Sequence, residues 1–136
     1  MGFLLEYRDD WGMIRPFFEG LSEGRLYGTR CPLCEKIYCP PRAHCPSTGC
    51  NLSQTEWVEL EPKGVLESYT ILGLSTQGHI DELPLILGLV RVNGCSTCLM
   101  MRVEAERDEL SCGARVEVRF REDAKRMRDL YAVLIG

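Results

Sequence analysis

Residues 30–50 read RCPLCEKIYCPPRAHCPSTGC, and this stretch decides the fold of the first half of the chain. Cys31 and Cys34 form a C-x2-C pair, and Cys45 and Cys50 form a wider C-x4-C pair. Both spacings allow two thiolates from one turn to reach the same tetrahedral metal ion. Four soft thiolates suit zinc or iron, and because no cluster-type spacing is present, zinc is the predicted ion.

The fourth ligand has two competitors within the same stretch. Cys39 lies midway along the arm between the two pairs, and His44 is adjacent to Cys45. Neighbouring side chains of an extended segment point to opposite faces, so His44 and Cys45 are poorly placed to share one ion. Cys50 is therefore the predicted fourth ligand. Four protein ligands leave no open position for water or substrate, so the predicted role of the zinc is structural.

The bulk composition is that of a small cytoplasmic protein. Eight cysteines in 136 residues do not spread along the chain as a disulfide framework would. Clustered cysteines favour metal binding in a reducing compartment. The first residues lack the pattern of a secretory signal, and no apolar run approaches the ~20 residues of a membrane span. A net charge of −4 argues against general nucleic-acid binding, so we expect neither a nucleic acid nor a membrane as partner.

Beyond residue 57 the pattern changes to that of β-strands. Apolar and polar residues alternate along 99–106 and 115–121, and the runs 63–74, 85–92 and 130–135 are rich in β-branched and apolar residues. Gly88 inside one run indicates a bent central strand, and Asn93-Gly94 is typical of a hairpin turn. Five strands with no convincing helix between them predict a small closed barrel, the five-stranded OB-fold. The expected fold is mainly β, with a short helical segment (1–26), a rubredoxin-like zinc ribbon (27–57) and the OB-fold (58–136).

A short helix is predicted within residues 10–30. Pro16 stands where helices begin, and Gly20 and Gly24 are expected to break the helix. A helix this short is unstable alone, so its aromatic residues must pack on something. These residues are Trp11, Phe17 and Phe18. They are candidate anchors for a partner protein, and the alternative is that they pack into the cleft between ribbon and barrel.

The segments of the whole chain, taken in order, resemble a known family. They read RPFFEGLSEGRLYGTRC, CPLC, YCPPRAHCP, WVELEPKGVLESYTIL, LPLILGLVRVNG and LSCGARVEVRF. With them the chain resembles, from Arg15 to Phe120, the zinc-ribbon/OB-fold family of acyl-CoA-associated proteins. Two positions depart from the family pattern. Thr48 stands where members have the last cysteine, and Glu35 stands where a glycine usually follows the first pair.

The resemblance implies an accessory subunit of a thiolase-superfamily enzyme. In such assemblies the thiolase-type partner carries the nucleophilic cysteine, and the small subunit helps to shape the acyl-CoA site at the shared interface. Catalysis by this chain alone is not expected. Two rival interpretations remain open at this point: a nucleic-acid-binding zinc-ribbon/OB module, and a rubredoxin-like iron protein that carries electrons.

Three further features could carry a function. Tyr69 and the loop around His79 are candidates for reaching the mouth of a partner's active site, because OB-folds bind through such loops. The alternative for His79 is a solvated loop residue. Cys95 and Cys98 form another C-x2-C pair, but no second pair completes a metal site, so chance placement is the preferred interpretation.

Overall fold

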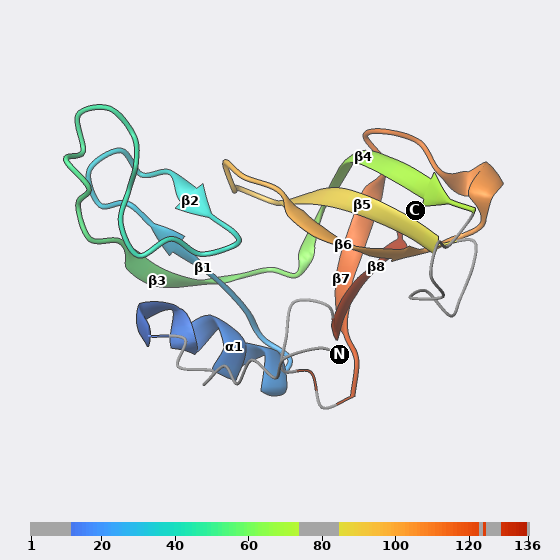
Figure 1. Ribbon diagram of the computed structural model, residues 1–136, viewed down its shortest axis with the longest axis horizontal. Helices are drawn as coiled ribbons and strands as arrows, with labels where there is room; N and C mark the ends of the chain where they lie inside the picture. The colour runs from blue at the N-terminus through green and yellow to red at the C-terminus, as the bar shows by residue number, and fades with distance from the viewer. Residues whose placement is uncertain (1–11, 74–84, 123, 125–128, 136) are drawn as a thin grey trace, which may run out of the picture.

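The computed structural model describes residues 12–73, 85–122, 124 and 129–135. It contains one short helix, a small sheet and a closed barrel (Figure 1). The elements are η1 (Gly12–Ile14), α1 (Arg15–Ser22), β1 (Leu26–Arg30), β2 (Ile37–Tyr38), β3 (Glu56–Leu60), β4 (Lys63–Leu72), β5 (Leu85–Val92), β6 (Leu99–Glu104), η2 (Arg107–Glu109), β7 (Arg115–Phe120) and β8 (Leu130–Leu134). This confirms the predicted fold class. In the part of the chain that is described, no helix has the length and apolar character needed to cross a bilayer.

The helix α1 has its proline in the first turn and is closed just beyond its last residue by the second of the two glycines. Pro16 lies in the first turn, where a missing N–H costs nothing. Gly24 has φ +71°. The N–H of Gly24 donates to the carbonyl of Leu21, and the N–H of Arg25 donates to that of Gly20, which closes the helix in a Schellman motif. The expectation that Gly20 breaks the helix is wrong. Gly20 lies inside it because an added Cβ would be 2.5 Å from the ring of Tyr27.

The small sheet has the order β2-β1-β3 and is antiparallel. Residues Leu26–Arg30, within the segment for which a helix was predicted, form its central strand. The strand β3 pairs with β1 from Leu26↔Leu60 to Arg30↔Glu56. It therefore belongs to this sheet and leads from it into the barrel. The domain limits expected at residues 57 and 58 fall within β3 and stay a prediction.

The barrel closes in the order β4-β5-β6-β8-β7, with β6 and β8 parallel and the other pairs antiparallel. The alternation in the sequence is repeated in the burial: Val116 and Val118 of β7 are buried, while Arg115 and Arg119 are exposed. Gly88 lies inside the barrel for packing reasons, since an added Cβ would be 2.6 Å from Leu66 Cδ1 and 2.7 Å from Val103 Cγ2.

The interior residues of the barrel continue into the ribbon as a single apolar cluster. Phe17 and Leu21 of α1, Cys39 and Leu60 belong to the same cluster as the barrel interior. A second, smaller cluster contains Tyr38 and three of the cysteines. The ribbon and the barrel therefore share one apolar core. Three of the four candidate metal-binding cysteines lie in a separate, smaller cluster.

The connection between β5 and β6, residues 93–98, joins the ribbon to the barrel. Its first turn has Gly94 at φ +86° and a hydrogen bond from the N–H of Cys95 to the carbonyl of Val92. Strand pairing resumes at Val90↔Leu99, so the turn at Asn93-Gly94 opens a longer connection rather than a two-residue hairpin. Figure 1 shows the hairpin of β5 and β6 reaching toward β2.

This connection makes several hydrogen bonds with the ribbon. The N–H of Ser96 donates to the carbonyl of Ile37 at 2.8 Å. The hydroxyl of Thr97 accepts from the N–H of Cys39 and donates to the carbonyl of Cys39, both at 3.1 Å. Thr97 thereby satisfies both backbone groups of the buried Cys39 and connects the ribbon to the barrel.

Candidate metal centre

The first pair of cysteines lies in a tight turn directly after β1. The N–H of Cys31 donates to the carbonyl of Lys36, and the N–H of Glu35 donates to the carbonyl of Cys31. The N–H of Cys34 points at Cys31 Sγ from 3.5 Å. Glu35 has φ +66°, a conformation that glycine adopts without strain. This is the physical reason for the glycine that the family pattern favours here, and Glu35 also forms an ion pair with Arg30 at 2.8 Å.

The second pair lies on a hairpin-like arm. The N–H of Cys45 donates to the carbonyl of Ser53, and the N–H of Thr55 donates to that of Ala43. The wider spacing is accommodated by an additional turn, in which the N–H of Cys50 donates to the carbonyl of Ser47 and Gly49 has φ +91°. This turn brings Cys50 back toward Cys45.

The four sulfur atoms form a compact cluster. Those of Cys31, Cys34, Cys45 and Cys50 all lie within 4.8 Å of one another. Cys31 Sγ is 3.8 Å from Cys50 Sγ, and Cys34 Sγ is 3.6 Å from Cys45 Sγ. These separations are far longer than a disulfide bond of about 2.05 Å. They match the edge of about 3.8 Å that a tetrahedron with zinc–sulfur bonds of about 2.3 Å requires. The donor set therefore fits one tetrahedral ion.

Hydrogen bonds and burial shift the pKa values of the thiols in opposite directions. The hydroxyl of Tyr38, 3.2 Å from Cys45 Sγ, lowers the pKa of Cys45 to about 6. The backbone N–H of Cys34 lowers the pKa of Cys31. Burial, followed by the neighbouring thiols, raises the pKa of Cys50 to about 12. Thiolates this close repel one another, and a divalent cation between them would remove that repulsion.

The competing ligands are not part of the cluster. Cys39 is fully buried in the large apolar cluster, where burial raises its pKa to about 12. His44 is exposed on the arm. Cys95 is buried in the large cluster and Cys98 is partly exposed. Within the described residues, the one group of side chains close enough to share a metal ion is the set of four cysteines, and it includes neither Cys95 nor Cys98.

The structure shows different surroundings for the predicted partner-facing residues. Phe17 is 1% exposed and belongs to the core, so its interpretation as an exposed anchor is corrected to the alternative, packing inside the chain. Phe18 is partly buried and packs edge-on against Phe17, with ring centroids 5.2 Å apart. Trp11 and His79 lie outside the described residues.

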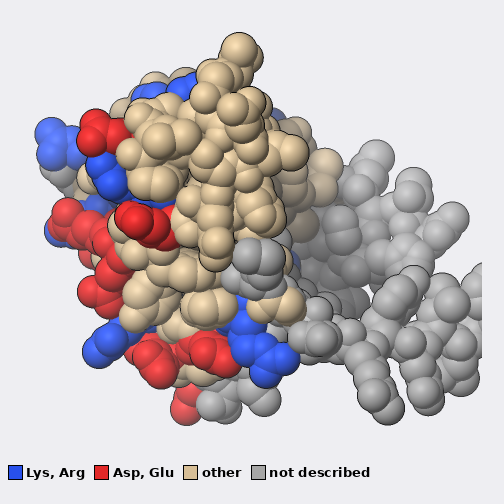
Figure 2. Space-filling view, turned by 90° about the vertical axis from the view of Figure 1, so that its left-hand side faces the viewer, with Lys and Arg blue, Asp and Glu red and all other residues tan. Residues whose placement is uncertain are grey.

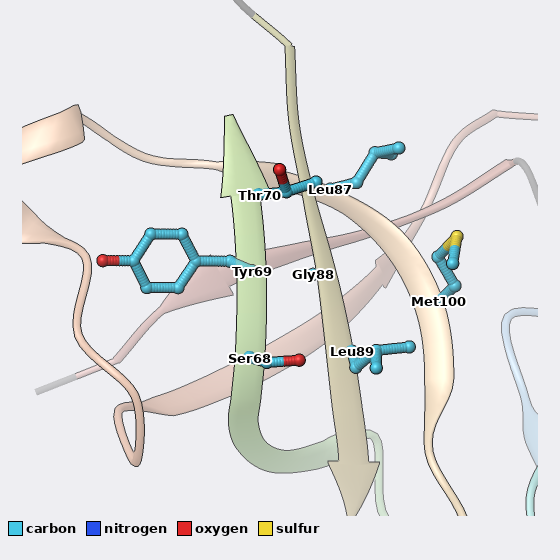
Figure 3. A pocket seen from close by; sticks show the side chains of 7 residues that line it. All are labelled: Ser68, Tyr69, Thr70, Leu87, Gly88, Leu89 and Met100. Carbon is cyan, nitrogen blue, oxygen red and sulfur yellow. The ribbon is translucent and has the colours of Figure 1, made fainter. Parts of the chain in front are cut away.

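Tyr69 borders a shallow hollow of about 200 Å³ on the barrel. The lining residues are Ser68, Tyr69, Thr70, Leu87, Gly88, Leu89 and Met100. In Figure 3, Leu87, Leu89 and Met100 project to one side of the strands, whereas Tyr69 projects to the other. Tyr69 packs against the large apolar cluster. The exposed apolar part of this hollow therefore comes from β5 and β6 and not from the tyrosine.

Two residues with a role at the centre were missed by sequence reasoning. Tyr38 contacts a cysteine sulfur, and Thr97 holds the ribbon from a position far along the chain. Neither has a sequence signal, because a tyrosine beside a cysteine and a threonine after a turn are both common. Only the three-dimensional path of the chain assigns them a role.

A four-cysteine ribbon that continues into a five-stranded barrel defines the class of zinc-ribbon/OB-fold proteins. Residues 18–53 match the rubredoxin-like zinc ribbon domain of ChsH2, and residues 57–121 match the C-terminal OB-fold domain of ChsH2. The chain therefore contains a zinc ribbon domain and an OB-fold domain of the ChsH2 type.

The known proteins similar to this chain include one relative in sequence and two solved structures. A DUF35 domain-containing scaffold protein of Methanothermobacter thermautotrophicus is 25% identical over 97 residues, which are 71% of this chain and 72% of that protein. Among solved structures, the Ltp2-ChsH2(DUF35) aldolase contains a chain with a TM-score of 0.68 and 24% identity, covering 93% of this chain and 97% of that one. A DUF35 protein of unknown function from Sulfolobus solfataricus has a TM-score of 0.68 and 21% identity, covering 93% and 90%. At these identities the two structures support the fold.

Proposed function

We propose that this protein is a non-catalytic subunit of an enzyme complex, in which it supports the acyl-CoA site of a thiolase-superfamily partner. In this view the nucleophile and the chemistry belong to the partner. The small subunit holds the partner's substrate channel in a reactive geometry, a contribution of positioning rather than of bond making. A particular candidate is the small subunit of benzoylsuccinyl-CoA thiolase. The proposal places the complex in the cytoplasm, where clustered cysteines stay reduced.

The observation that carries the proposal is similarity, over 71% of the chain in one case and 93% in the other, to proteins whose names point to assemblies. One relative is named a scaffold protein, and a solved structure names ChsH2 together with Ltp2 in an aldolase. The named partner is an aldolase, so the thiolase assignment depends on the family resemblance.

The metal in this proposal is structural zinc. Cys31, Cys34, Cys45 and Cys50 would hold it, and a filled tetrahedral shell has no position for a substrate. Its contribution is stability: structural zinc binding contributes about 10–16 kcal/mol in ribbon-sized peptides. The apolar cluster around these cysteines is small, so the ribbon depends on the ion for its shape.

Co-expression tests the proposal. The chain is tagged and produced together with a thiolase-superfamily subunit of the same organism, and the pair is examined by size-exclusion chromatography and by thioester turnover. We expect a stable complex whose turnover exceeds that of the partner alone, and no turnover by the small chain alone. A chain that cleaves or forms thioesters unaided would contradict the proposal, as would the absence of a complex.

Metal analysis of the same preparation tests the zinc assignment. One zinc per chain and a colourless solution are expected. A red protein with one iron per chain would instead favour the rubredoxin-like electron carrier, because a four-thiolate iron centre absorbs visible light. Binding to single-stranded DNA or RNA at low salt would favour the nucleic-acid module.

A further inference from the structure

The side chain of Tyr38 is buried beside the candidate metal ligands. Tyr38 is 4% exposed and belongs to the small cluster that contains three of the four cysteines. Side chains alternate along an extended chain, and the neighbours of Tyr38 pack elsewhere: Ile37 packs against the large apolar cluster, and Cys39 belongs to it. The strand β2 therefore directs Tyr38, and neither of its neighbours, toward the metal centre.

The backbone on both sides of Tyr38 is held by the connection between β5 and β6. The N–H of Ser96 donates to the carbonyl of Ile37 at 2.8 Å. The hydroxyl of Thr97 makes hydrogen bonds with both backbone groups of Cys39, each at 3.1 Å. The barrel thus holds the short strand that places the phenol beside the cysteines.

The hydroxyl of Tyr38 is the middle of a chain of polar contacts. Its oxygen lies 3.2 Å from Cys45 Sγ and 3.3 Å from Ser47 Oγ. Lys36 Nζ donates to the same Ser47 Oγ at 3.1 Å. Lys36 is exposed, whereas Cys45 is 0% exposed. The contacts therefore connect an ammonium group at the surface with a fully buried sulfur atom.

The chemistry of these groups fixes the direction of the hydrogen bonds when a metal ion is bound. An ammonium group can only donate, so Ser47 Oγ accepts from Lys36. A metal-bound thiolate has no proton, so the hydroxyl of Tyr38 donates to Cys45 Sγ. The proton of Ser47 is then free to donate to the oxygen of Tyr38. Every bond in the chain points toward the sulfur, and each one polarises the next in the same sense.

The sulfur of Cys45 lies in a part of the chain that has no charged side chains of its own. Four thiolates carry more negative charge than a divalent ion neutralises. The arm 43–55, which contains Cys45 and Cys50, reads AHCPSTGCNLSQT and has no Asp, Glu, Lys or Arg. Figure 2, which faces the ribbon end, shows a broad area without charged side chains, with the charges at its margins. The positive charge that acts on Cys45 through Tyr38 therefore comes from outside the arm.

A second cation acts on the same phenol. The guanidinium carbon of Arg42 lies 5.5 Å from the centroid of the Tyr38 ring. A cation over the face of an aromatic ring is attracted by the ring electrons. It draws electron density away from the hydroxyl, which makes the O–H a stronger donor. The position of Arg42 thus acts in the same direction as the chain from Lys36.

We propose that Tyr38 is a positioning residue of the metal centre: its hydroxyl, backed by Ser47 and Lys36, donates to the thiolate of Cys45 and so tightens the hold on the ion. The inference rests on the zinc assignment within the proposed function, and adds residues outside the four ligands that set metal affinity. It does not depend on the identity of the partner subunit. Hydrogen bonds to metal-bound side chains orient these ligands and tune the metal.

The test uses the full chain and two measurements. Zinc affinity is measured by competition with a chromophoric chelator. Hydrogen bonding to sulfur is followed by the sulfur-to-metal charge-transfer absorption of the cobalt(II)-loaded chain. Tyr38→Phe, which removes a single oxygen atom, should weaken zinc binding about 10- to 100-fold. It should also move the charge-transfer band to longer wavelength, because a thiolate that has lost a hydrogen bond gives up an electron more readily.

Two further variants interrupt the chain without touching the sulfur. Ser47→Ala and Lys36→Met should each change the affinity and the band in the same directions as Tyr38→Phe, by smaller amounts. The control is Tyr131→Phe in β8, which removes the same oxygen atom from a partly exposed tyrosine of the barrel and should change neither quantity.

A role of Tyr38 in packing alone predicts a different result. Tyr38→Phe would then lower the urea unfolding midpoint and the zinc affinity while the charge-transfer band stays at the wild-type wavelength, and this outcome would overturn the inference. Wild-type affinity in Tyr38→Phe, or wild-type behaviour of Ser47→Ala, would also overturn it. In each of these cases a tetrahedral cobalt spectrum of the wild-type chain leaves the zinc assignment standing. Without that spectrum in the wild type, the zinc assignment and the inference fail together, whereas complex formation with the partner is judged separately.

Discussion

Replacing Thr97 with valine tests how the barrel holds the ribbon. Valine has nearly the same shape but lacks the hydroxyl, which accepts from the N–H of Cys39 and donates to its carbonyl, both at 3.1 Å. Cys39 is 0% exposed, so the variant leaves two buried backbone groups without these partners. Each such group costs about 1–3 kcal/mol, so we expect a loss of about 2–6 kcal/mol in the free energy of unfolding. With a urea m-value of about 2 kcal/mol/M, the unfolding midpoint should fall by about 1–3 M.

The control is Thr97→Ser, which keeps the hydroxyl and removes one methyl group. Its loss should be about 1 kcal/mol or less. Both variants are measured with zinc bound, by urea unfolding followed by circular dichroism and linear extrapolation. Equal losses for valine and serine would show that the methyl group matters and not the hydrogen bonds. A valine variant as stable as wild type would refute the reasoning, because the backbone groups of Cys39 would then have other partners.

Three further changes have calculable results. Cys50→Ser should abolish stoichiometric zinc binding and the hydrogen-exchange protection of the ribbon, whereas Cys112→Ser, at an exposed position, should retain one zinc per chain, as measured by elemental analysis. Gly88→Ala should lower the free energy of unfolding by about 1–3 kcal/mol, because its Cβ would overlap packed barrel side chains; unchanged stability would mean that the barrel interior has room. Burial raises the pKa of Cys39 to about 12 and that of Cys95 to about 11, above that of an unfolded thiol. The folded state then holds these protons more tightly, so stability should fall as the pH rises above about 9. Cys39→Ala should flatten this fall relative to wild type, Cys112→Ala should not, and equal slopes in all three proteins would contradict the assignment.

Much of the fold could be predicted because its signals are local. The alternation along 115–121 survives in the structure as buried Val116 and Val118, and Pro16 begins the helix as expected. The error at Gly20 has a tertiary cause, since this glycine accommodates the ring of Tyr27 rather than ending a helix. The turn at Asn93-Gly94 was recognised, but its length depends on contacts with the ribbon that no local pattern contains.

At the metal centre too, local sequence predicted one part and tertiary contacts decided the other. The spacing of the two pairs predicts a four-cysteine site, because residues two to four apart in a turn can reach one ion. Spacing alone left Cys39 and His44 as competitors of Cys50. The folded chain separates them, because Cys39 enters the large core and His44 faces solvent.

The sequence alone determined that this protein has a cysteine-bearing ribbon followed by five strands, because cysteine spacing and strand alternation are properties of neighbouring residues. Tertiary structure decided which cysteine joins the cluster and how Thr97 joins the ribbon to the barrel. These features depend on residues that are distant in the chain and meet only when it folds, so no local pattern could specify them.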